Sequence, residues 1–244
     1  MTEPLIVARS LTIGHSDRVL LENADFEVAR GDVFVILGGS GCGKSTLLRH
    51  LIGLERPMAG AIEIAGFGAP RLSGEAPEFG VMFQSGALFS SLTVGENVAF
   101  ALAEWTDLPQ PAINAIVRAK LALVGLEAAE DKLPAEISGG MKKRAAIARA
   151  LAFEPALLFL DEPSAGLDPV SAAELDELII VLNRALGLTV VMVTHELPSI
   201  FKVGKSCIML DKESRSIIAR GNPRSLERES RDPRVRRFFR REAA

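Results

Sequence analysis

Residues 33–51 read VFVILGGSGCGKSTLLRHL, and this stretch decides the fold. It opens with an apolar run, Val33 to Leu37, that is typical of a buried strand, and it closes with apolar residues at helical spacing. Between the two, residues 38–45 match the pattern of Gly, four residues, then Gly-Lys-Ser. A strand, a glycine-rich loop and a helix in this order predict a phosphate-binding turn at the start of the helix.

Each residue type in this loop has a chemical reason. Glycines let the backbone curl so that successive N–H groups point inward at a phosphate, and the helix start adds the positive end of its dipole. Lys44 can then reach the β- and γ-phosphates of ATP, while the Ser45 hydroxyl is placed to bind Mg²⁺. The predicted nucleotide-binding residues here are Gly38, Gly39, Ser40, Gly41, Cys42, Gly43, Lys44, Ser45 and Thr46.

A second apolar run ends in two adjacent carboxylates. Residues 156–160 read ALLFL, and Asp161 and Glu162 follow directly. In an open parallel sheet, ligands bind at the carboxyl ends of the strands, where these two side chains would lie. Asp161 suits a Mg²⁺ site, and Glu162 can act as the general base that polarises the water attacking the γ-phosphate.

A third segment predicts another anion-binding helix start. Residues 137–141 read ISGGM, and the helical pattern KKRAAIARALAF follows. Ser138 is placed to cap this helix, whose first turn, Gly139 and Gly140, is bare glycine backbone. Two phosphate sites leave two arrangements open. Either both grip one phosphate within the chain, or two chains pair head to tail and each nucleotide lies between them.

Composition limits the class of protein. The chain is 48% hydrophobic with a net charge of -3, which argues against nucleic acid as a partner, since phosphate binding needs clustered basic residues. Residues 212–244 nevertheless carry a net charge of +6, which fits either a docking surface or a solvated terminal helix. Only Cys42 and Cys207 are present, so no disulfide framework is implied. No apolar run reaches the roughly 18 residues of a spanning helix, so a membrane role needs a partner chain.

Taken in order, the motifs resemble those of ABC-transporter ATPases over nearly the whole chain. Besides the three segments above, the family's order includes Gln84 in VMFQS, Asp168 in SAGLD and His195 in VMVTHE. The resemblance implies that Gln84 senses Mg²⁺ and the permease, that His195 holds the γ-phosphate, and that Asp168 crosses a dimer interface. The implied catalytic residues are Glu162, His195, Gln84 and Lys44, and the implied metal ligands are Ser45, Gln84 and Asp161.

The chain departs from the family pattern at several positions. The signature segment has Met141 where many members have Gln, and it starts with Ile137 rather than Leu, although Ser-Gly-Gly is intact. There is no tyrosine, so another residue must take the place of the aromatic ring that usually stacks on adenine. Counted from the LLENADF segment, His15 falls at that position and is predicted to stack on adenine.

The expected fold is an α/β P-loop NTPase of ABC type, with a mainly parallel core sheet flanked by helices. An N-terminal antiparallel β subdomain and a helical insertion complete it. The whole chain, 1–244, is expected to be one ABC ATPase domain. Its predicted parts are a nucleotide-binding core of 1–85 and 138–220, a helical subdomain of 86–137 and a basic C-terminal tail of 221–244.

Some longer phrases also resemble one group within the family. FQSGALFSSLTVGENVAF, ISGGMKKRAAIARA and DPRVRRFF are similar to ATPases that drive phospholipid movement with MCE-domain proteins, the maintenance-of-lipid-asymmetry group. That resemblance implies a homodimer using ATP and Mg²⁺ beneath a permease, at the cytoplasmic face of the inner membrane. ATPases of polar amino acid importers share much of this wording and remain an alternative. A non-transport ABC nucleotide switch is a second alternative, against which Glu162 speaks.

Overall fold

The computed structural model describes residues 3–15, 18–70 and 78–241, and its strands form two sheets. The six-stranded sheet has the order β5-β6-β7-β3-β8-β9, in which β9 runs antiparallel to β8 and the other pairs are parallel. A three-stranded antiparallel sheet has the order β2-β1-β4. The predicted fold class, with its parallel core and N-terminal antiparallel sheet, is confirmed.

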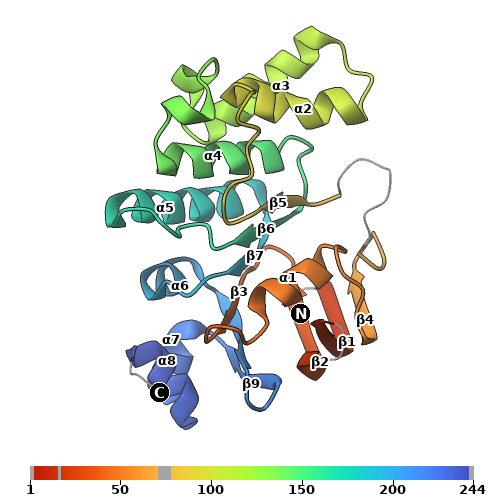
Figure 1. Cartoon of the computed structure of the whole chain (residues 1–244), viewed down its shortest axis with the longest axis vertical. Coiled ribbons are helices and arrows are strands. Elements are labelled where there is room, and N and C mark those ends of the chain that lie inside the picture. Colours follow the sequence, from red (N-terminus) through yellow and green to blue (C-terminus); the bar gives the residue numbers. More distant parts are fainter. Residues whose placement is uncertain (1–2, 16–17, 71–77, 242–244) are drawn as a thin grey trace.

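Figure 1 labels the elements along the chain. The strands are β1 (Pro4–His15), β2 (Arg18–Ala29), β3 (Val33–Gly38), β4 (Ala59–Ile64), β5 (Gly80–Met82), β6 (Leu157–Asp161), β7 (Thr189–Val193), β8 (Ser206–Asp211) and β9 (Ser216–Gly221). The α-helices are α1 (Lys44–Leu51), α2 (Val94–Trp105), α3 (Gln110–Leu123), α4 (Gly139–Ala150), α5 (Pro169–Leu186), α6 (Leu197–Val203), α7 (Pro223–Glu229) and α8 (Pro233–Arg240). Within the described ranges, no helix has both the length and the apolar character needed to cross a bilayer.

Strand β3 divides its side chains between two hydrophobic cores. Successive residues of a strand point to opposite faces, and all six residues of β3 are buried. Val35 belongs to the core shared with α4, α5 and α6, whereas Ile36 belongs to the core shared with α1 and the three-stranded sheet. A strand covered on both faces needs the continuous apolar run seen in the sequence. The start of the phosphate loop is therefore anchored between two packed layers.

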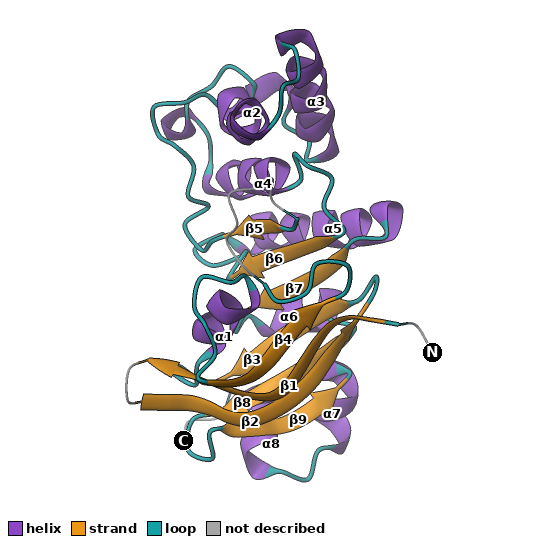
Figure 2. Cartoon of the chain, turned by 90° about the vertical axis from the view of Figure 1, so that its right-hand side faces the viewer, coloured by secondary structure: helices purple, strands orange, loops and turns teal. Residues whose placement is uncertain are grey.

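Helices α2 and α3 form one end of the molecule, next to α4 and away from β1, β2 and β4 (Figure 2). Helix α2 begins with a capping box, because the Thr93 hydroxyl accepts from the Glu96 N–H and the Glu96 carboxylate accepts from the Thr93 N–H. Asn97 is fully buried, and its side chain exchanges two hydrogen bonds with the backbone of Phe89, at 2.8 and 3.1 Å. These contacts fix the path of the chain between β5 and α2.

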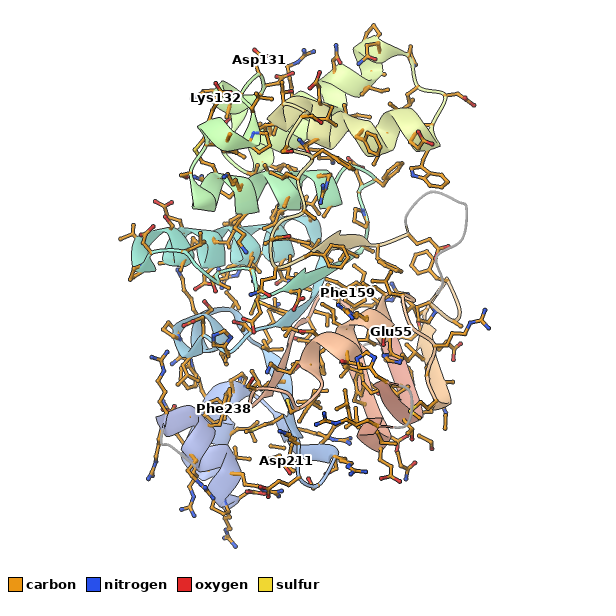
Figure 3. The ribbon with its side chains drawn as sticks, viewed as in Figure 1. Glu55, Asp131, Lys132, Phe159, Asp211 and Phe238 are labelled. Carbon is orange, nitrogen blue, oxygen red and sulfur yellow. The ribbon has the colours of Figure 1, made fainter. Side chains whose placement is uncertain are left out.

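The segment predicted as a basic tail is a pair of packed helices, α7 and α8. Phe239 of α8 is buried, and its ring lies on that of Phe201 in α6 with centroids 5.6 Å apart. Arg234 Nη1 lies 3.0 Å from Oδ2 of Asp211, which is labelled in Figure 3 at the end of β8. The apolar residues of this stretch therefore complete the core, while most of its charges stay outside. Residues 242–244 of the predicted tail lie outside the described residues.

Candidate functional site

The phosphate loop leaves β3 through a position that requires glycine. Gly38 has a φ of 144°, and a Cβ added there would lie 2.5 Å from both Cys42 Sγ and the carbonyl oxygen of Leu210. Lys44 begins α1, and its Nζ donates to the carbonyl oxygens of Gly38 at 2.9 Å and Gly39 at 3.1 Å. The ammonium group thus folds back over the loop, where a bound phosphate would offer it a stronger, charge-assisted partner.

Asp161 ends β6 beside the start of α1. Burial and the neighbouring Glu162 raise the pKa of its carboxyl, while a hydrogen bond from Ser45 acts in the opposite direction. The Oδ1 atom of Asp161 is buried and has no hydrogen-bond partner. An unpartnered carboxylate oxygen next to a hydroxyl fits Mg²⁺, which takes one or two protein oxygens and completes its shell with phosphate oxygens and water. No cluster of three or more His, Cys, Asp or Glu side chains suited to a metal occurs in the described part of the chain.

Glu162 and His195 meet although they lie 33 positions apart in the sequence. Strands β6 and β7 are parallel neighbours with Asp161 opposite Val193, so the residues just beyond them emerge at the same edge. His195 Nδ1 lies 2.8 Å from Oε1 of Glu162, whereas the Oε2 atom of Glu162 is buried without a partner. One carboxylate oxygen is therefore held in place, and the other has no hydrogen-bond partner.

A cavity of about 570 Å³ opens beside Asp161. It lies between the segment that follows β5 and the turn that precedes α5. Its lining residues are Phe83, Gln84, Ser85, Asp161, Ala165 and Gly166. The structure therefore brings Gln84 and Asp161, both predicted from the sequence as metal ligands, to the same cavity, which we call the Asp161 cavity.

His15 lies next to the phosphate loop. Its Nε2 is 3.2 Å from the Thr46 hydroxyl, and its Nδ1 is 3.5 Å from Oε2 of Glu55, a residue labelled in Figure 3. The imidazole side chain is 52% exposed, so one part of it remains open to solvent. This location agrees with the position expected for a group beside the nucleotide, and stacking on adenine stays a prediction.

Cys42 is a small buried residue of the loop. Its side chain is 1% exposed, and burial raises the pKa of the thiol, although the positive charge of Lys44 acts against that rise. A protonated and covered thiol is a poor nucleophile. The structure thus favours a packing role for Cys42.

The signature segment starts α4, as predicted. The Ser138 hydroxyl accepts a hydrogen bond from the Met141 N–H at 3.2 Å, which caps the helix. Gly139 and Gly140 lie beside the start of α5. A Cβ added at Gly139 would be 3.5 Å from Leu167 Cδ2, and one added at Gly140 would be 3.4 Å from Cβ of Ser171. The free backbone N–H groups of this first turn are available to an anion.

Asp168 is exposed and caps α5. Its Oδ1 accepts from the N–H groups of Val170 and Ser171, both at 3.0 Å, and the hydrogen bonds from Ser171 hold the pKa of its carboxyl below the usual value. This capping role was not predicted from the sequence, although an Asp directly before Pro169 is a typical helix start. The crossing of a dimer interface by Asp168 stays a prediction.

Two basic side chains of α4 donate hydrogen bonds to the segment that follows β5, and neither was predicted from the sequence to belong to the site. Lys143 Nζ donates to the carbonyl oxygen of Gln84 and lies 3.4 Å from that of Glu162. Arg149 donates to the carbonyl oxygens of residues 86–87, at 2.9 and 2.6 Å. Helical spacing from the buried residues of α4 is the signal that could have placed both side chains inward.

Comparisons with known proteins agree with this site. A family model described as ABC transporter matches residues 21–165. The chain is 40% identical over 241 residues, 96% of this chain and 88% of the relative, to the "Intermembrane phospholipid transport system ATP-binding protein MlaF" of Escherichia coli K12. It is 41% identical over 239 residues, 96% of this chain and 66% of the relative, to the "Probable ribonucleotide transport ATP-binding protein mkl" of Mycobacterium tuberculosis H37Rv.

A solved structure extends the comparison to three dimensions. It is the dimeric, post-hydrolysis state of the ATP-binding cassette MJ0796 bound to ADP and Pi, with a TM-score of 0.77 and 26% identity over 89% of this chain and 98% of that chain. The family model covers more than half of the chain. The phosphate loop and the carboxylate pair follow the carboxyl ends of β3 and β6, two strands of the same sheet. The chain belongs to the ABC transporter family, as one of its ATP-hydrolysing cassettes.

Proposed function

We propose that the chain hydrolyses Mg-ATP to energise phospholipid transport, as one of two identical subunits beneath a partner permease that works with an MCE-domain protein. The observation that carries the hydrolytic part is the Glu162 carboxylate, with one oxygen held by His195 and the other buried and free. The phospholipid part rests on the likeness to MlaF over nearly the full length of both chains.

The nucleotide binds with its phosphates on the loop that precedes α1. Lys44 then exchanges the carbonyl oxygens of the loop for the β- and γ-phosphates, because a charged oxygen is the stronger partner. Ser45, Asp161 and Gln84 would hold Mg²⁺, which would neutralise part of the charge on the phosphates. The side chains of Thr46 and His15, which are 3.2 Å apart beside the loop, would contact the adenosine.

Hydrolysis then needs a base at the open side of the γ-phosphate. The Oε2 atom of Glu162 accepts a proton from water as the water oxygen bonds to the γ-phosphorus and the bond from that phosphorus to ADP breaks. His195 keeps the carboxylate aimed through its Nδ1 contact of 2.8 Å with Oε1, and its exposed ring can approach the γ-phosphate. Each of the two residues thus has a separate role in the same step.

Two chains are needed to enclose the nucleotide. The first turn of α4 lies beside the segment that leads into α5. Its residues Ser138, Gly139 and Gly140 therefore share one face of the molecule with Asp168. In a head-to-tail pair this face covers the γ-phosphate bound by the partner subunit, and closure excludes water from it. The dimeric state of the structural relative MJ0796 supports this arrangement.

The permease docks on an apolar groove of about 460 Å³ that adjoins the segment after β5. Among its lining residues, Phe83, Phe89 and Phe100 are between 38% and 46% exposed. A groove with exposed aromatic rings fits a short apolar segment of another chain. Because Phe83 directly precedes Gln84, movement of that segment would reach the Asp161 cavity. Binding to the permease would also place the chain at the cytoplasmic face of the inner membrane.

The decisive experiment is purification of the tagged chain from detergent-solubilised membranes, followed by mass spectrometry of its partners and extraction of lipids. We expect a multi-span permease, an MCE-domain protein and bound phospholipid. A polar amino acid binding protein in their place would refute phospholipid as the transported molecule and favour an amino acid importer. A bound ribonucleotide would instead favour the cargo given in the name of the relative mkl. Absence of any membrane partner would favour the nucleotide switch.

Two matched variants of α2 test the groove in the same experiment. Phe100 lines the groove and is 46% exposed, whereas Trp105 is 42% exposed on the same helix and does not line it. A buried unpaired carboxylate is costly at an interface, so Phe100→Asp should lose the permease while Trp105→Asp should keep it. Equal recovery of the permease with both variants would remove the groove from the proposal.

A further inference from the structure

We infer that Lys143 is a positioning residue for ATP hydrolysis, whose ammonium group holds the backbone of Gln84 and Glu162, so that Gln84 faces the Asp161 cavity and Glu162 keeps its contact with His195. This inference rests on the proposed role of Glu162 as the base. Lys143 belongs to α4, the helix that starts at the signature segment. Its side chain contacts the two loops that flank the site.

The ammonium group of Lys143 lies between these two loops. Lys143 is 7% exposed, and its Nζ donates to the Gln84 carbonyl oxygen and lies 3.4 Å from the Glu162 carbonyl oxygen. Burial lowers the pKa of Lys143, while the charges of Asp161 and Glu162 act to raise it. A buried ammonium group is costly unless its N–H groups donate hydrogen bonds, so Lys143 depends on these two carbonyl oxygens for its place in the fold.

The backbone of Glu162 needs such support. Its φ of 46° lies in the left-handed region, which is strained for a residue that carries a side chain. Its N–H donates to the Val193 carbonyl oxygen at 2.8 Å, and its own carbonyl oxygen accepts from the Ala165 N–H at 3.2 Å as well as facing Lys143. Rotation of this peptide toward a relaxed conformation would swing the carboxylate away from His195.

The segment after β5 needs support for the same reason. It contains two residues in succession with positive φ, Gly86 at 75° and Ala87 at 47°. Arg149 holds the carbonyl oxygens of these two residues, and Lys143 holds that of Gln84, the residue that faces the cavity. Arg149 has no contact of this kind with Glu162, so among these described contacts only Lys143 bridges the two loops.

The test compares Lys143→Met with Lys120→Met. Lys120 of α3 is also 7% exposed, and its Nζ lies 2.8 Å from Glu154 Oε1, outside the Asp161 cavity. Both variants remove a buried ammonium and retain most of the side-chain volume. Each is measured for kcat of phosphate release with saturating Mg-ATP and for the Kd of a fluorescent ATP analogue. If Lys143→Met does not purify in a folded state, Lys143→Gln is used in the same assays.

A positioning role predicts a selective loss of turnover. A displacement of about 1 Å in a catalytic group costs up to about a hundredfold in rate, so we expect kcat of Lys143→Met to fall by about tenfold or more, with Kd changed by less than about threefold. Lys120→Met should keep kcat within about threefold of the wild type. Equal kcat for the two variants would overturn the inference.

A double variant separates this inference from the proposed function. If Lys143 acts through Glu162 as well as Gln84, part of its effect is lost once the base is removed, so Lys143→Met in a Glu162→Gln background should slow hydrolysis by a smaller factor than it does in the wild type. An equal or larger factor would mean that Lys143 acts independently of Glu162 and would refute the inference. Normal turnover in Glu162→Gln alone would instead refute the proposed base, whatever Lys143→Met does.

Discussion

Replacement of Glu162 by Gln tests the chemistry of the site with little change in shape. The Oε1 atom of Glu162 accepts from His195 Nδ1 at 2.8 Å, and the amide oxygen of Gln can accept the same hydrogen bond. The amide nitrogen then replaces Oε2, the buried oxygen that has no partner, and a donor takes the place of a proton acceptor. The nucleotide-binding loop, including Lys44, is untouched by the change.

The expected magnitude follows from the loss of the base alone. General-base catalysis contributes typically about 10²–10⁴ in rate, so turnover should fall at least about a hundredfold, which corresponds to about 2.7 kcal/mol in the barrier. Affinity for ATP should stay within about threefold of the wild type, because no phosphate contact is lost. Phosphate release by the purified complex and titration with a fluorescent ATP analogue measure the two quantities separately.

Glu196 provides a matched control for this variant. Its Oε1 lies 3.5 Å from the other ring nitrogen of His195, and its side chain is 40% exposed. An exposed pair of this kind contributes little, so Glu196→Gln should keep turnover within about threefold. Near-normal turnover in Glu162→Gln would show that Glu162 is not the base.

The Glu162→Gln variant, saturated with ATP and supplied with its permease, should also be dimeric by light scattering. A monomer under these conditions would refute the paired arrangement.

Three further predictions concern nucleotide binding, pH and packing. Lys44→Ala should lose at least about tenfold in affinity for an ATP analogue, since a charge-assisted contact is worth about 1.5–3 kcal/mol, and unchanged affinity would contradict the assigned role. Burial raises the pKa of the Asp176 carboxyl above its usual value of 3.8. The charged carboxylate therefore destabilises the fold at pH values above the raised pKa, and this penalty disappears as the pH falls below 3.8. Asp176→Asn can still accept from Ser199, and it should therefore raise the melting temperature at pH 7.5 by more than it does near pH 4; a gain independent of pH would contradict the shift. Phe239→Ala should lower the free energy of unfolding by about 3–5 kcal/mol in urea titrations, and half-buried Phe238→Ala by less than half as much, whereas equal losses would contradict the packing of α8.

Local parts of the site could be predicted because their chemistry is contained in a few consecutive residues. The apolar run, glycines, Lys44 and Ser45 specify a strand, a turn and a helix start within one short segment, and the structure has all three in that order. Ser138 was predicted to cap a helix and does so, since a cap depends on a side chain and an N–H three residues away. Gly187, at a φ of 64°, ends α5 in the same local way.

The packing of the C-terminal segment could not be predicted from its charge. Phe239 packs on Phe201, and Arg234 contacts Asp211. Net charge reports what a segment exposes on average and does not say which side chains find an apolar partner on the body. The partner of Phe239 lies in α6, too far along the chain for local periodicity to identify it.

The sequence by itself determined the family, the phosphate-binding loop and the pair of carboxylates, because each depends on residue types at short spacing. Tertiary structure alone decided that Glu162 meets His195 and that Lys143 reaches the carbonyl oxygens of two loops. The first contact exists because β6 and β7 are parallel neighbours in register, and the second because α4 packs against the edge of that sheet. Strand order and helix placement are set by burial of whole apolar faces, which is a property of the folded chain and of no single segment.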